Sequence, residues 1–203
     1  GRGDLRVIDV PPTGVDGPRL STLDAAIVLE PDALAPAAWD DLRAFVDNGG
    51  LLMVTPSADE EIQLWTDAFL ESMGLGWSIA RGVAEVDDAV DTGSVEADRG
   101  LLGMLAGEFE ALAAGVGVSR IAPVDLAEAS ASVELATESG EPLLVVGSPE
   151  GGEGGLSRGL VAYLASAPTP SWTDLPTRPL MVPMLQELIR QGVGRARGSS
   201  VAV

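Results

Sequence analysis

Continuous apolar runs alternate with apolar residues at helical spacing in the first part of the chain. The runs over 24–29 (DAAIVL) and 51–55 (LLMVT) are typical of strands buried on both faces of a parallel sheet. The apolar residues between the two runs share one helical face and are Ala38, Leu42, Phe45 and Val46. The glycines of 48–50 end this predicted helix. A shorter strand is predicted over 5–10.

The rest of the chain carries similar patterns. Ser57 and Glu60 fit a capping box at the start of a helix. The apolar residues that share one face of this helix are Ile62, Trp65, Phe69 and Met73. The further predicted elements are a helix over 101–114, a strand over 116–121, a hairpin of 132–137 and 142–147, a strand over 160–165 and a helix over 180–191.

Strand–helix–strand–helix order at this spacing predicts an α/β fold with a mainly parallel sheet, to which the hairpin is an addition. Residues 1–192 are expected to form one domain, because no internal repeat and no linker divides them. The acidic, weakly patterned stretch 81–100 is interpreted as a surface loop, and 193–203 as a flexible tail.

The composition excludes the common kinds of catalytic site. The chain has no Cys and no His, and all twelve of its basic residues are Arg. Nucleophile–base pairs that use Cys or His, ordinary zinc sites and lysine chemistry are therefore closed to it. Carboxylate chemistry, the binding of hard cations, or no chemistry remains. We expect no cofactor and no enzymatic activity.

The net charge of −19 predicts that neither nucleic acid nor an anionic membrane surface is a direct partner. No apolar run reaches the roughly 18 residues that a membrane span needs. The chain starts almost directly in a strand pattern and ends in a loose Gly/Arg/Ser tail. We therefore expect it to be cut from a larger protein whose membrane anchor lies outside these residues.

Three apparent motifs have simpler interpretations. Residues 155–159 (GLSRG) match the G-x-S-x-G nucleophile elbow, but an apolar strand pattern follows the serine and the chain has no His, so we interpret them as a loop. The same loop lacks the glycine spacing of a phosphate cradle.

The carboxylates of Glu85, Asp87, Asp88 and Asp91 are oxygen ligands suited to Ca²⁺ or Mg²⁺, yet lack EF-hand spacing. A solvated acidic loop is the preferred interpretation of these four residues.

Two stretches resemble known families. Residues 24–29, followed by 42–54 (LRAFVDNGGLLMV), are similar to the core of the class I glutamine amidotransferase-like superfamily. Residues 160–164 (LVAYL), followed by 171–185 (SWTDLPTRPLMVPML), resemble the closing segment of bacterial aerotolerance-operon (Bat-type) membrane proteins. Together these stretches cover about half of the chain, and the second is the more specific.

The resemblance implies a flavodoxin-like sheet with helices on both faces, flanking transmembrane segments, and a location on the extracytoplasmic (periplasmic) side of a bacterial membrane. In active amidotransferases, the strand after the Gly-Gly turn ends in a catalytic Cys. Thr55 takes that place here, and Ser57 is close to it. Because no His is present, the resemblance implies a degenerate, non-catalytic site.

We therefore expect an interaction or scaffold domain that contacts other envelope proteins through loops at the carboxyl edge of the sheet. Trp172 and Asp174 in the Pro-rich loop 168–179 are candidate contacts. A packing role is the preferred alternative, in which Trp172 is buried and Asp174 bonds nearby backbone. The rival function is a carboxylate-dependent hydrolase or a small-molecule binder of the cell envelope, which requires acidic groups facing one cleft.

Overall fold

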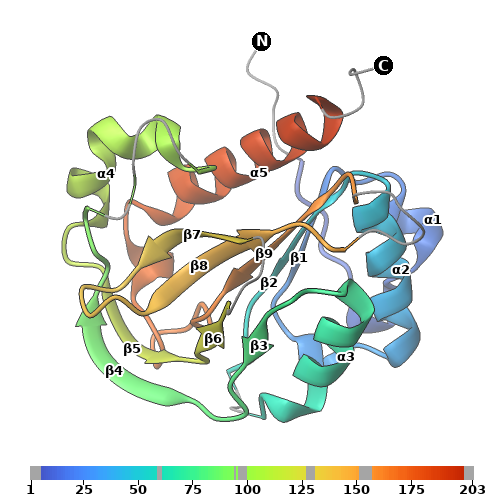
Figure 1. The fold of residues 1–203 in the computed structure, drawn as a ribbon, viewed down its shortest axis with the longest axis horizontal. Helices are drawn as coiled ribbons and strands as arrows, with labels where there is room; N and C mark the ends of the chain where they lie inside the picture. Colours follow the sequence, from blue (N-terminus) through green and yellow to red (C-terminus); the bar gives the residue numbers. More distant parts are fainter. Residues whose placement is uncertain are drawn as a thin grey trace.

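A computed structural model describes residues 6–58, 61–93, 95, 100–126, 131–150 and 157–198, with side chains as far as residue 194. A five-stranded sheet forms its centre, in the order β1-β2-β9-β8-β7 (Figure 1). The strands are β1 (Ala25–Val28), β2 (Leu51–Val54), β9 (Leu160–Leu164), β8 (Pro142–Gly147) and β7 (Ala131–Ala136).

The sheet is mixed, with most strands running in one direction. β1, β2 and β9 are parallel neighbours, with Val28 beside Val54 and Val54 beside Tyr163. β8 is antiparallel to both β9 and β7, so it alone runs against the other four strands. The predicted parallel pairing is confirmed for β1, β2 and β9, and the predicted hairpin is confirmed as well.

The longer helices lie on the two faces of this sheet (Figure 1). They are α2 (Pro36–Asp47), α3 (Gln63–Met73) and α5 (Met181–Gly198). Trp65 of α3 packs against Tyr163, which lies beside Val54. Gly192 of α5 lies against the side chain of Leu51. Because side chains alternate along a strand, Leu51 and Val54 point to opposite faces, so α3 and α5 cover opposite faces.

The turn between α2 and β2 depends on its two glycines. Gly49 has φ 99°, in the left-handed region that favours glycine. Gly50 lies under the ring of Phe45, and a Cβ there would come within 2.4 Å of ring atoms. Gly159 approaches the carbonyl oxygens of Val46 and Gly50 so closely that a Cβ would stand 2.3 Å from each. The last glycine of the apparent G-x-S-x-G motif is therefore required for packing.

The remaining strands form two small sheets outside the central one. Two two-stranded antiparallel sheets pair β3 (Ser78–Ile79) with β6 (Val124–Asp125) and β4 (Ala84–Ala89) with β5 (Gly117–Ile121). Among the described residues, the remaining helices are α1 (Gly17–Leu20), α4 (Ala106–Ala113) and the 3-10 turns Pro12–Gly14, Pro31–Ala33, Gly103–Leu105 and Leu175–Thr177.

Four sequence predictions about local structure were wrong. Residues 81–100 contain β4, whose Ala84 and Val86 are partly buried while Glu85 and Asp87 face solvent, so its many acidic residues hid a strand. The predicted tail from 193 continues α5 as far as residue 198. Residues 6–10 form no strand. The helix predicted to begin near Ser57 starts at Gln63, and Glu60 of the proposed capping box lies outside the described residues.

Candidate functional site

Thr55 and Ser57 lie where the strand β2 ends, at the carboxyl edge of the parallel strands and before α3. Thr55 is 1% exposed, and its hydroxyl donates to the carbonyl oxygen of Pro56 (3.2 Å). Ser57 is also buried, and its Oγ has no hydrogen-bond partner in the described part of the chain. Within the described ranges, neither hydroxyl is therefore hydrogen-bonded to a side chain that acts as a base.

Other buried polar atoms belong to elements that begin or end at the same edge. The hydroxyls of Thr66, on α3, and Ser166, just beyond β9, have no partner among the described residues. Tyr163, the largest polar side chain of β9, donates its hydroxyl to the carbonyl oxygen of Ala122 (3.1 Å). Burial raises the pKa of this phenol well above its ordinary value, so it stays neutral and provides no base.

Trp172 is fully buried, as the packing interpretation predicts. Its carbonyl oxygen accepts hydrogen bonds from the backbone N–H groups of Ser119 (2.7 Å) and Arg120 (3.1 Å) in β5. Its ring has no exposed surface, so the ring itself cannot touch a partner in this conformation. The structure therefore places Trp172 in the core, where it joins the closing loop to β5.

Asp174 completes this connection. Its Oδ1 accepts the backbone N–H of Gly117 (2.8 Å), and its Oδ2 pairs with Arg178. The bond from Arg178 holds the pKa of the Asp174 carboxyl below its ordinary value. The hydroxyl of Thr173 donates to the carbonyl oxygen of Gly117 (2.8 Å). Residues 172–174 are thus hydrogen-bonded along β5, and these bonds hold the loop in place.

The four acidic residues of the apparent cation loop are dispersed along β4 and just beyond it. Glu85 forms an ion pair with Arg120 (3.6 Å), and Asp88 accepts the backbone N–H of Ser139 (3.0 Å). Asp87 adopts a positive φ of 43° at an irregularity in the pairing with β5, and Asp91 accepts the N–H of Gly93 (2.9 Å). No group of three metal-ligating side chains occurs among the residues that the structure describes.

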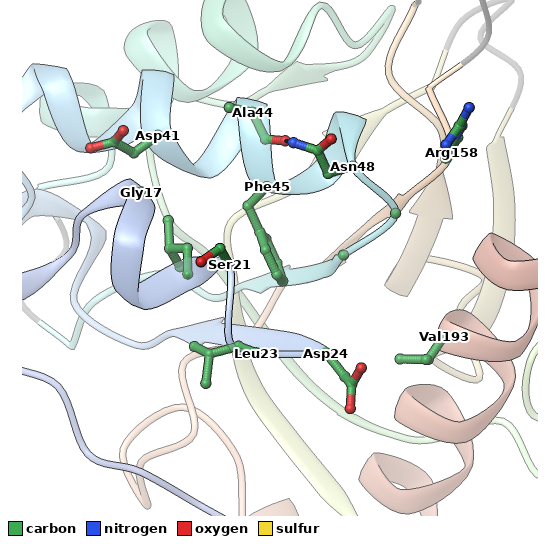
Figure 2. A pocket seen from close by; sticks show the side chains of 13 residues that line it. Gly17, Ser21, Leu23, Asp24, Asp41, Ala44, Phe45, Asn48, Arg158 and Val193 are labelled. Carbon is green, nitrogen blue, oxygen red and sulfur yellow. Dashed lines mark hydrogen bonds between the residues drawn. The ribbon is translucent and has the colours of Figure 1, made fainter.

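A pocket of about 460 Å³ lies at the opposite, amino edge of the parallel strands (Figure 2). Asp24 directly precedes β1, Gly50 directly precedes β2, and Arg158 comes shortly before β9. The pocket is large enough for a small ligand. Ligand sites in open α/β sheets are expected at the carboxyl edge, so no sequence pattern pointed to this one.

The polar groups of the pocket are far apart. In Figure 2, Asp41 lies at the upper left, Asp24 below and to the right of the centre, and Arg158 at the upper right. The hydroxyl of Ser21 donates to the carbonyl oxygen of Pro18 (2.8 Å), and the amide of Asn48 donates to that of Ala44 (2.8 Å). The arrangement can bind polar groups of both charges but presents no nucleophile with a base.

No protein-family model matches the sequence, and no curated protein matches it either. Solved structures do resemble the fold. The cytoplasmic protein STM3548 from Salmonella typhimurium aligns with a TM-score of 0.64 and 14% identity, over 87% of this chain and 74% of its own. The cytoplasmic protein STM1381 from Salmonella typhimurium LT2 gives 0.55 and 14%, over 91% and 75%.

The N-terminal domain of mmIFT52 gives a TM-score of 0.53 and 16% identity, over 89% of this chain and 81% of that domain. At these identities the likeness is one of fold alone. It supports the α/β architecture of nearly the whole chain. None of the helices in the described part of the chain is long and apolar enough to cross a membrane.

Proposed function

We propose that this chain is a non-catalytic interaction domain of a larger, membrane-anchored protein of the bacterial cell envelope, working on the periplasmic side. The observation that carries the proposal is the state of Thr55 and Ser57. These hydroxyls stand where the amidotransferase resemblance puts a nucleophile, yet both are buried and neither is bonded to a base among the residues that the structure describes. Absence of Cys, His and Lys from the whole chain supports the same conclusion.

The finer description of the fold is part of this proposal. We infer a flavodoxin-like, amidotransferase-like sheet in which β1, α2 and β2 are the resembling core. The parallel pairing of β1 with β2 and the Gly-Gly turn that leads into β2 support it. The Bat-type resemblance of the closing segment is what places the domain in an envelope protein.

Activity measurements test the non-catalytic proposal. The purified domain is expected to show no glutaminase or esterase turnover above buffer, and Thr55→Ala and Ser57→Ala are expected to match the unmodified chain. Turnover that either substitution abolishes would contradict the proposal. Photo-crosslinking of the membrane-anchored protein in its own envelope tests the proposed interaction function, because an interaction domain is expected to yield specific protein adducts.

The pocket at the amino edge favours a second candidate, the binding of a small polar molecule in the envelope. Its volume fits such a ligand, and Arg158 offers a cation opposite the carboxylates of Asp24 and Asp41. Thermal-shift screening with amino acids, small sugars and dicarboxylates is the test. A stabilising compound should lose its effect in Arg158→Ala and keep it in Arg81→Ala, which removes an arginine whose side chain is 75% exposed.

A further inference from the structure

β1 is the last strand on its side of the five-stranded sheet (Figure 1). Its pairing with β2 runs from Ala25 beside Leu51 to Val28 beside Val54 without a shift of register. No other strand among the described residues pairs with it. The strand therefore has one side bonded to β2 and one side that ends the sheet.

The backbone groups on the outer side of β1 are paired with none of the described residues. The inner groups are identified by their bonds: the carbonyl oxygens of Asp24 and Val28 accept the N–H groups of Leu51 and Thr55 (both 3.1 Å). Backbone groups alternate along a strand, so those of Ala25 and Ile27 point outward. No hydrogen bond from either outward residue to a described residue is present. An unpaired row of this kind is a template for another strand.

Apolar side chains follow the same edge. Ile27, on β1, is 42% exposed, and Leu29, directly after the strand, is 53% exposed. Val28, whose side chain points to the face opposite that of Ile27, is 9% exposed. The edge thus offers two partly uncovered apolar side chains beside its free N–H and C=O groups.

The acidic residues around β1 favour a partner segment that carries positive charge. No basic residue occurs between positions 20 and 42, whereas acidic residues stand at both ends of β1, with Asp24 before it and Glu30 and Asp32 after it. A second copy of the chain would bring the same carboxylates and a net charge of −19 to the contact. A segment with Lys or Arg on either side of its apolar residues would meet opposite charges instead.

We propose that the outer edge of β1 accepts, as a sixth strand, an extended segment of a partner protein that has apolar residues at alternate positions flanked by Lys or Arg. Main-chain hydrogen bonds to Ala25 and Ile27 would hold the segment, and contacts with Ile27 and Leu29 would select its apolar residues. This inference rests on the proposed interaction function and names its surface and the kind of partner.

The test measures binding of a fluorescent probe peptide, acetyl-Lys-Thr-Val-Thr-Val-Thr-Lys-amide, to the purified chain by anisotropy. Ile27→Lys puts a charge on the edge and is expected to weaken binding at least tenfold. Val133→Lys is the matched control, because Val133 is 43% exposed on β7, the opposite edge of the sheet, and the change in charge is the same. It is expected to leave binding within twofold of the unmodified chain.

A second variant separates backbone pairing from charge. Ile27→Pro removes one outward N–H while leaving the N–H groups that face β2, and it should also abolish binding. Circular dichroism and thermal melting confirm that each variant is folded. A variant that fails to fold is set aside, and Ile27→Thr, which removes only apolar surface, takes its place with an expected loss of about threefold.

Several outcomes would overturn the inference. Absence of probe binding, equal binding to Ile27→Lys, or equal binding of the same peptide with Glu in place of Lys would each do so. Concentration-dependent dimers that Ile27→Lys abolishes would assign the edge to a second copy. If envelope crosslinks persist unchanged in Ile27→Lys, the edge assignment fails and the proposed function stands. Measured turnover would remove the proposed function and leave the probe result untouched.

Discussion

The two edges of the central sheet are built differently. On one side, the pairing of β7 with β8 shifts register twice, between Val133 and Leu135 and again between Leu135 and Ala136. Thr137, just beyond β7, bridges to Val90 of the region around β4. On the other side, β1 is regular and no further strand of the described chain continues it.

A side chain also protects the β7 edge. The carboxylate of Glu134 turns inward and accepts the backbone N–H groups of Leu101 (2.6 Å) and Leu102 (3.3 Å) and the hydroxyl of Ser132 (2.8 Å). Irregular pairing and an inward charge are ways in which proteins prevent an edge strand from pairing with another chain. β1 has neither within its four residues. One edge is therefore shielded by irregular pairing and an inward carboxylate, whereas the other ends in a regular strand without either device.

The largest effect is expected where the closing loop holds the region that borders β7. Trp172→Ala should lower the free energy of unfolding by about 3–5 kcal/mol, because it empties a fully buried aromatic site whose loop bonds β5. Urea denaturation followed by circular dichroism measures this. Trp172→Phe is the control and should cost less. An unchanged midpoint for Trp172→Ala would show that the loop does not hold this side of the molecule.

The second-largest loss of unfolding free energy is expected when the inward carboxylate of Glu134 is removed. Glu134→Ala leaves the buried N–H groups of Leu101 and Leu102 without their acceptor and should cost about 2–3 kcal/mol. Glu138→Ala, an exposed position just beyond the same strand, should change the unfolding free energy by less than about 0.5 kcal/mol. Equal effects of the two substitutions would remove the argument that Glu134 closes this edge.

The contact between Asp88 and the hairpin turn predicts a pH dependence. Hydrogen bonds from Ser139 are the main cause that lowers the pKa of Asp88 to about 2. Because this value lies below the ordinary pKa of about 3.9, the stabilisation is fully present above that pH and is lost as the pH falls toward 2. The stability difference between the unmodified chain and Asp88→Asn should therefore shrink between about pH 4 and pH 2. A constant difference would contradict the assignment.

The smallest effect is expected on the open edge. Ile27→Thr should change the free energy of unfolding by less than about 0.5 kcal/mol, because the side chain is already 42% exposed. Its neighbour in register, Met53, is 2% exposed, and Met53→Ala should cost about 2–5 kcal/mol in the same denaturation experiment. A large loss for Ile27→Thr would mean that Ile27 serves the fold and is not available to a partner.

Much of the local structure could be predicted because its signals lie within one element. The continuous apolar runs of β1 and β2, the helical spacing of α2 and the turn between β7 and β8 each appear within about twenty residues of sequence. β4 was missed because its acidic residues hid a weak alternation of Ala84 and Val86 with Glu85 and Asp87. The pocket was missed because its Asp24, Asp41 and Arg158 come from three separate parts of the chain.

Residue type and local period are enough to predict the α/β class, the lack of Cys, His and Lys chemistry, and the burial of a large ring such as that of Trp172. The three-dimensional arrangement was needed to see that β9 inserts between β2 and β8. It also shows that β1 is the outermost strand, although the apolar run of β1 resembles that of the central β2. The physical reason is that strand order depends on pairing between segments far apart in the chain, and a run of apolar residues does not record how many neighbours it will have.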